Sequence, residues 1–456
     1  MEVSKPSPPA RPPRKHYLDN LRNFATAHVI VHHTAASYGY GGGPNGPHSA
    51  CFDKPSPLVT ACLAVDLAWG LGQFFWISGY FSAESLTKSG DAKFIKNKLM
   101  RLGVPALLYS LFLHPLQAVF ELPKWDWASV KKAYVDAFLQ FKGAAGSAWH
   151  SATILSLDLF VVLLKRFVYI MGLRQMLSAK SPRLGQLYVQ LCRWGWTAVA
   201  AGSFLIRTKF PPGRKMPLID VEPSFVLQYA YAYAMGHLAY HAKKPRLMSL
   251  VESGLPDYTP KNTSPKLSLL KASAFAAASL PVLFVPGLVE KYLSRKKAVS
   301  TNSDKKQASS SDGSGMNKEK ADPSPDITSE TNLLAGWTTT AALSAVWAEV
   351  LFNTISPAHV SYMERNHAKP NKMKLLSPRY AYGAFLLHSP VSWVIGETVD
   401  SFLCPDGKKP DWMESKVWKD YGPLVMSGVV GTADVVASYA TSMLLIDYVP
   451  GVSKIL

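Results

Sequence analysis

Long apolar stretches separated by short polar ones dominate the pattern along the chain. Most of these stretches reach about 20 residues, the length that an α-helix needs to cross the hydrocarbon core of a bilayer. An open sheet edge would leave backbone groups unpaired in lipid, so the stretches predict helices. The pattern predicts an all-α, polytopic membrane protein with about ten transmembrane helices, near residues 21–38, 57–82, 101–120, 148–166, 194–210, 223–242, 272–289, 333–354, 379–400 and 423–447.

Two polar segments set the predicted domain organisation. Residues 1–20 form a basic, Pro-rich N-terminal segment, and residues 291–331 form a loop rich in Ser, Lys and Asp. The loop has too few apolar residues to bury a core, so it is predicted to be disordered. The membrane core is therefore predicted in two parts, 21–290 with the first seven helices and 332–456 with the last three.

Composition supports a membrane protein and disfavours a nucleic-acid partner. Hydrophobic residues make up 48% of the 456 positions and charged residues 18%, against roughly 25% charged in a soluble domain. The net charge of +18 is compatible with nucleic-acid binding. However, the basic residues lie between apolar segments, where they act as topology signals. We therefore expect the lipid bilayer, and no nucleic acid, as a partner.

The distribution of basic residues predicts the orientation. An even number of helices puts both termini on one side. If that side is the cytosol, the cytosolic segments hold about twice as many Lys and Arg as the opposite loops, leaving out 291–331. We expect cytosolic termini, in an endomembrane (ER or Golgi) or the plasma membrane. The sequon at Asn262 then faces the cytosol and should stay unmodified.

The first predicted helix carries candidate chemistry. Arg22 and His33 are 11 positions apart, which is about 1100°, so they share one helix face about 16 Å apart along the axis. With Arg22 at the cytosolic surface, His33 lies near the midplane, where a neutral imidazole can serve as a general base. A core histidine bonded to a neighbouring helix is the other interpretation. His28 and His32 share a different face and are predicted to be structural.

Later helices add further candidates. Ser78 lies in the "WISGYFS" stretch of the second helix, and Lys98 and Arg101 precede the third. That basic pair could hold the phosphates of an anionic cofactor or could be only a topology signal. Tyr382 and His388 lie in the ninth helix. No metal-ligand spacing is present beyond the adjacent pair of histidines at 32–33, so no metal is expected.

The four cysteines fall in different predicted environments. Cys62 lies inside the second helix and Cys192 at a cytosolic edge, where thiols stay reduced. Cys51 and Cys404 lie in the loops after the first and ninth helices, on the predicted non-cytosolic side. A bridge between these two loops and two separate thiols both remain open, because sequence does not give the distance between them.

Several segments together carry a resemblance to a known family. The chain resembles the acyltransferase-3 family of multi-pass membrane proteins, in the fungal-type branch similar to glucan-modifying acyltransferases. The segments occur in the family's order; they are "YLDNLRNFATAHVIVHH", "FFWISGYFS", "FIKNKLMRLGVP", "PSFVLQYAYAYAMGHLAY", "YAYGAFLLHSPV" and "DYVPGVSKIL".

The resemblance implies a reaction and roles for residues. It implies about ten helices and transfer of an acyl group, commonly acetyl from acetyl-CoA, to a hydroxyl. The family's basic residue–ten residues–histidine signature matches Arg22 and His33. Its pair of basic residues three apart matches Lys98 and Arg101, and its late tyrosine-to-histidine segment matches Tyr382 and His388. The chain departs from the family's Trp-Phe-Leu start of the fourth helix, where it has "WHS" at 149–151.

The resulting hypothesis is a membrane-bound O-acyltransferase. His33 would deprotonate the acceptor hydroxyl, with Arg22 and His388 in the catalytic set and with Ser78 and Tyr382 orienting the acceptor. Lys98 and Arg101 would hold acyl-CoA, which is a co-substrate rather than a bound cofactor. The acceptor would be a secondary metabolite, such as a terpenoid or polyketide alcohol, or a glycan. A proton-coupled multi-pass transporter is the alternative, because intramembrane His, Glu and Asp also form proton relays.

Overall fold

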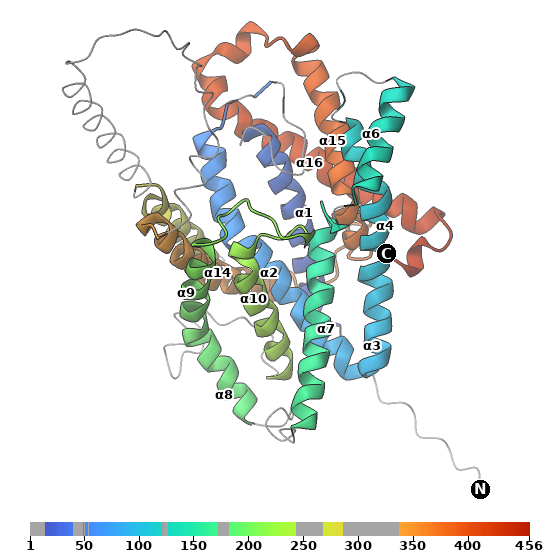
Figure 1. Ribbon diagram of the computed structural model, residues 1–456. Helices are drawn as coiled ribbons and strands as arrows, with labels where there is room; N and C mark the ends of the chain where they lie inside the picture. The colour runs from blue at the N-terminus through green and yellow to red at the C-terminus, as the bar shows by residue number, and fades with distance from the viewer. Residues whose placement is uncertain are drawn as a thin grey trace, which may run out of the picture.

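Helices make up nearly all of the described part of the chain (Figure 1). The computed structural model describes residues 14–39, 49, 51–52, 54–120, 122, 126–141, 143–171, 182–242, 268–285 and 337–456. The α-helices are α1 (His16–Gly39), α2 (Pro57–Ser89), α3 (Asp91–Lys98), α4 (Val104–Leu108), α5 (Pro115–Phe120), α6 (Trp127–Leu139), α7 (Ala148–Ile170), α8 (Pro182–Gln190), α9 (Trp196–Arg207), α10 (Pro223–His241), Ser268–Val285, α14 (Thr339–Asn366), α15 (Ala381–Leu403) and α16 (Lys416–Tyr448). A two-residue parallel pair, β1 (Gly143–Ala144) with β2 (Leu218–Ile219), is the exception in the described residues. The all-α prediction is confirmed.

The predicted membrane helices have counterparts in the structure. A helix lies at each of the ten predicted positions, and four described helical runs are long and apolar enough to cross a membrane by themselves: Pro57–Ser89, Asp91–Phe120, Ser268–Val285 and Lys416–Tyr448. These apolar helices fit an integral membrane protein. The number of crossings stays a prediction. The predicted loop 291–331, most of the N-terminal segment and Asn262 lie outside the described residues.

Two helices include residues outside the predicted apolar stretches. The helix α6 falls where a loop was expected, and it starts with an N-cap in which Asp126 accepts from the Ser129 amide at 3.0 Å. The helix α16 begins seven residues early, capped by Ser415, which accepts from the Trp418 amide at 3.3 Å. Both starts are set by capping side chains rather than by apolar length, so a search for apolar stretches does not detect them.

The run from α3 to α5 contains two π-helical turns, Leu99–Gly103 and Tyr109–Leu113. Pro105 has no backbone N–H to donate to the carbonyl four residues earlier, so the α pattern is interrupted there. The second turn is closed by the His114 amide on the Tyr109 carbonyl at 2.8 Å. Such turns in long helices are frequent at functional sites.

The helices α2 and α10 pack closely through two reciprocal glycines. A Cβ at Gly79 would overlap the Tyr233 carbonyl, and a Cβ at Gly236 would overlap the Trp76 carbonyl. Small residues at such positions let two backbones approach, which is how helices associate in lipid without a hydrophobic driving force.

We expect Gly79→Ala to lower the thermal unfolding temperature of the detergent-solubilised protein. The added methyl meets backbone rather than a side chain that could move, and overpacking of this kind costs about 1–3 kcal/mol. The matched control is Gly428→Ala on α16, where no atom lies within 4 Å of an added Cβ and where the better helix propensity of Ala should raise stability slightly. Equal unfolding temperatures for the two variants would contradict this view of the α2–α10 contact.

A disulfide joins two loops that are distant in sequence. Cys51 and Cys404 are bridged, with their Cα atoms 5.8 Å apart. Tyr38, Phe52 and Met413 belong to the buried cluster around them. The hypothesis of a bridge is confirmed, and it ties the chain after α1 to the end of α15.

Candidate active site

Two histidines from helices far apart in sequence meet inside the bundle. The ring centroids of His33 on α1 and His388 on α15 are 5.0 Å apart, with an interplanar angle of 31°. His388 is buried, with 2% of its surface exposed, whereas His33 is half-buried. The structure therefore brings together both histidines of the predicted catalytic set.

A buried carboxylate holds their helices together. Asp434 on α16 is fully buried and accepts from Thr34 of α1 at 3.0 Å, from Ser438 at 3.1 Å and from Ser392 of α15. Thr34 follows His33 directly, and Ser392 lies one turn after the second histidine. The carboxylate thus fixes the register in which the imidazoles meet. The sequence reasoning missed Asp434, although an acid inside an apolar run was the available signal.

Hydrogen bonding fixes the tautomer of His388. Its Nδ1 lies 2.5 Å from the Phe385 carbonyl oxygen, which can only accept, so Nδ1 carries the proton. The Ser147 hydroxyl lies 3.4 Å from the same nitrogen. The Nε2 atom of His388 therefore keeps its lone pair. Within the described residues the His33 ring has no hydrogen-bond partner, so both of its nitrogens are available for hydrogen bonding.

The two predicted orienting residues lie in different surroundings. The Tyr382 hydroxyl is 3.1 Å from the Ser151 hydroxyl of α7. The Ser78 hydroxyl donates to the Phe74 carbonyl of its own helix at 2.9 Å. In the part of the chain that is described, Ser78 has no hydrogen bond to either histidine of the pair. Tyr382 therefore contacts another polar side chain, whereas Ser78 bonds, among the described residues, only to the backbone of its own helix.

Residues 149–151, where the chain departs from the Trp-Phe-Leu pattern of the family that it resembles, lie beside this site. His150 is 2% exposed, and its ring centroid lies 5.1 Å from that of Phe385, one turn before His388. The rings of Phe74 and Phe75 lie 4.8 Å from it. Its Nε2 has no hydrogen-bond partner among the described residues. The sequence analysis did not select His150, since a histidine following Trp149 gave no spacing signal.

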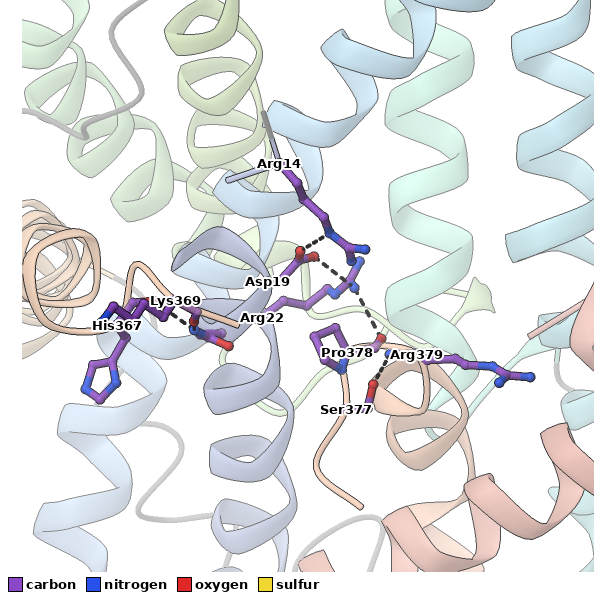
Figure 2. A network of polar contacts seen from close by, with 9 residues as sticks. Arg14, Asp19, Arg22, His367, Lys369, Ser377, Pro378 and Arg379 are labelled. Carbon is purple, nitrogen blue, oxygen red and sulfur yellow. Dashed lines mark hydrogen bonds and ion pairs between the residues drawn. The ribbon is translucent and has the colours of Figure 1, made fainter. Parts of the chain in front are cut away.

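Arg22 anchors the N-terminal half of α1 to the segment before α15 (Figure 2). It donates to the Pro378 carbonyl at 3.2 Å and lies 3.5 Å from the Asp19 carboxylate, which also binds Arg14 at 2.6 Å. Asn20 adds bonds to the carbonyls of residues 367 and 369, both at 2.8 Å. Arg22 and His33, which lie 11 positions apart on one face of α1, thus both contact the segment 378–388, which leads into α15.

The two predicted cofactor-binding residues differ in how far they are already paired. The Lys98 ammonium is 2.8 Å from the Asp158 carboxylate and 2.5 Å from the Ser82 hydroxyl, and the Tyr233 hydroxyl donates to the same carboxylate at 2.5 Å. The Arg101 side chain is exposed. Arg101 therefore has the more accessible charge.

The fold and the site define a class of protein. It is a helical protein with membrane-length apolar helices and a pair of imidazoles in its interior, one of them with a fixed tautomer. Such a pair suits proton transfer to and from a bound group. The family model described as "Acyltransferase domain", that of the acyltransferase-3 family, matches residues 15–443. The chain belongs to this family and is a membrane acyltransferase. Searches of curated proteins and of solved structures returned no match.

Proposed function

We propose that this protein is a membrane-bound O-acyltransferase that moves an acetyl group from acetyl-CoA to a hydroxyl of a secondary metabolite or a glycan. Family membership supports acyl transfer in general. The observation that carries the proposal is the contact between His33 and His388, one ring unpartnered in the described residues and the other with its Nε2 lone pair available. The secondary metabolite in this proposal is a terpenoid or polyketide alcohol.

The proposed reaction needs one base, which takes a proton from the acceptor hydroxyl and later gives it to the leaving thiolate. His33 takes the proton of the acceptor hydroxyl while the oxygen attacks the thioester carbonyl. The carbon–sulfur bond then breaks, the ester forms, and the thiolate of CoA takes the proton back from His33. His388 lies against His33 and can stabilise the imidazolium that forms between these steps. The Tyr382 hydroxyl, held by Ser151, and the Ser78 hydroxyl are proposed to orient the acceptor or the oxyanion.

The phosphates of acetyl-CoA are proposed to meet the basic residues at the cytosolic end of α3 and of the following π-turn. Arg101 offers an exposed guanidinium, whereas Lys98 and Arg22 are already engaged by acids. A guanidinium binds phosphate in a bidentate fashion, so Arg101 should carry most of the binding energy.

We expect Arg101→Ala to raise the KM for acetyl-CoA by roughly 10-fold or more, since a charge-assisted hydrogen bond contributes about 1.5–3 kcal/mol. The KM for the acceptor should change little. Arg193→Ala, which removes an exposed arginine from the π-turn before α9, is the matched control. A change confined to the acceptor would reject this assignment.

One experiment tests the activity itself. The full chain, reconstituted in nanodiscs, is incubated with acetyl-CoA labelled in the acetyl group and with lipid, glycan and metabolite extracts of the host. We expect label in an ester product of one extract, found by chromatography and mass spectrometry. Label that stays in acetyl-CoA or appears only as acetate in every extract would refute the proposal.

The proposed orientation has both termini in the cytosol. The bridge between Cys51 and Cys404 supports it in part, since their two loops must lie on one side of the membrane and disulfides persist in non-cytosolic compartments.

A further inference from the structure

The helix α1 presents a second pair of imidazoles to α2. The Asp66 carboxylate on α2 has one oxygen 2.6 Å from Nε2 of His28 and the other 3.1 Å from Nδ1 of His32. Each oxygen thus pairs with one ring, and the cluster joins α1 to α2. The sequence analysis treated the two histidines as structural and did not select Asp66.

This cluster is open rather than sealed. The side chains of His28 and His32 are each 24% exposed and that of Asp66 is 21% exposed. His28 lies at the middle of the 24-residue helix α1, hence at membrane depth. A charged side chain facing lipid there costs about 2.5–3.5 kcal/mol even on the insertion scale, and such groups face the bundle interior or water instead. The exposed surface of the cluster is therefore expected to meet water or a polar ligand rather than lipid.

Aromatic rings border the same partly exposed cluster. Phe24 is 41% exposed, stacks on His28 with ring centroids 5.6 Å apart and meets His359 of α14 edge-on at 4.6 Å. Trp69 lies 5.3 Å from His28 on the other side. A few convergent polar groups within apolar and aromatic walls are the composition of a small-molecule site.

The cluster is close to the proposed base. The ring centroids of His32 and His33 are 5.7 Å apart, and neither ring is fully buried. A hydroxyl that donates to the Asp66 carboxylate beside His32 would therefore lie about one side chain from His33.

We propose that the cluster of His28, Asp66 and His32 is the acceptor-binding site, and that its ligand is a hydroxyl-bearing amphiphile that enters between α1 and α2. The carboxylate and imidazoles bind the hydroxyl, and Phe24 contacts the apolar body. The assignment rests on the proposed acyltransferase function for its biological meaning, but binding can be measured without any turnover.

Access of water to this face of α2 is tested first, on the unmodified protein in liposomes. Cys62 lies one turn before Asp66 on α2 and is exposed, Cys192 is buried, and the other two cysteines are bridged. We expect a charged methanethiosulfonate, present on both sides of the membrane, to modify Cys62, as seen by a mass shift that Cys62→Ser abolishes. Modification by the uncharged N-ethylmaleimide alone would place Cys62 against lipid and overturn the proposal.

The binding of an alcohol is tested with a photoreactive octanol that carries a diazirine. We expect its adducts to concentrate on the peptides that contain Phe24, His32 or Asp66, and to fall at least five-fold in Asp66→Asn. Asp136→Asn, the same change at an exposed position of α6, should label like the wild type. If Asp66→Asn does not fold, His32→Gln serves the same comparison. Adducts spread evenly over the apolar helices, or unaffected in both variants, would overturn the assignment even if the protein transfers acetyl groups.

Discussion

His33→Ala is expected to lower kcat for acetyl transfer by a factor of about 100 to 10,000, the range that a positioned general base contributes. Of the two contacting imidazoles, only His33 has both ring nitrogens without a partner in the described residues, whereas His388 uses Nδ1 on a backbone carbonyl. The variant should still fold, because no hydrogen bond of the described structure depends on the His33 ring. Initial rates at saturating acetyl-CoA and acceptor measure the effect.

Two other histidines provide the comparison. His367→Ala removes an exposed ring and keeps the carbonyl that accepts from Asn20, so it should retain wild-type kcat. His32→Ala should lose much less kcat than His33→Ala, with its main effect on the KM for the acceptor. Size-exclusion profiles and an intact disulfide report folding of each variant. A His33→Ala protein with wild-type kcat would refute the mechanism.

Lys98→Met is expected to destabilise the protein by about 3–5 kcal/mol, the cost of breaking a buried ion pair by removing one partner. Asp158 is 1% exposed and the Lys98 side chain 18% exposed, so the carboxylate would be left as an uncompensated buried charge. The thermal unfolding temperature and the yield of folded protein in detergent should both fall.

The double variant Lys98→Met with Asp158→Asn separates the effect of Lys98 on stability from its effect on acetyl-CoA binding. It removes both charges and leaves an amide that can still accept from Tyr233, so stability should return to near the wild-type value. The KM of this variant for acetyl-CoA then measures what Lys98 contributes to phosphate binding. A double variant as unstable as Lys98→Met would show that the pair is not the reason for the loss, and an unchanged KM would remove Lys98 from the cofactor site.

The sequence predicts the helices and part of the site for a physical reason. Apolar length is a local property, so the positions of α2 and of the helix Ser268–Val285 follow from hydropathy alone. The shared face of Arg22 and His33 also follows, because helix geometry fixes angles within one element. These signals need no knowledge of which helices are neighbours.

The partners could not be predicted in the same way. That Asp434 binds the turn after His33, or that Asp66 binds His28 and His32, depends on which helices pack together, and a single sequence does not specify this. The pairing of Lys98 with Asp158 was missed for the same reason. The early start of α16 depends on a capping side chain, which hydropathy does not detect.

The bridge between Cys51 and Cys404 has a consequence for biosynthesis. The sequence separation between its cysteines is 353 residues. Cys51 therefore cannot pair with Cys404 until nearly the whole chain has been made and inserted. The bridge can form only after the C-terminal end of α15 lies beside the loop that follows α1. Because the same event brings the helices of His33 and His388 together, closure of the bridge marks the earliest stage at which a newly made chain can hold these two histidines side by side. A chain arrested before α15 would carry Cys51 as an unpaired thiol, open to mixed disulfides with other proteins.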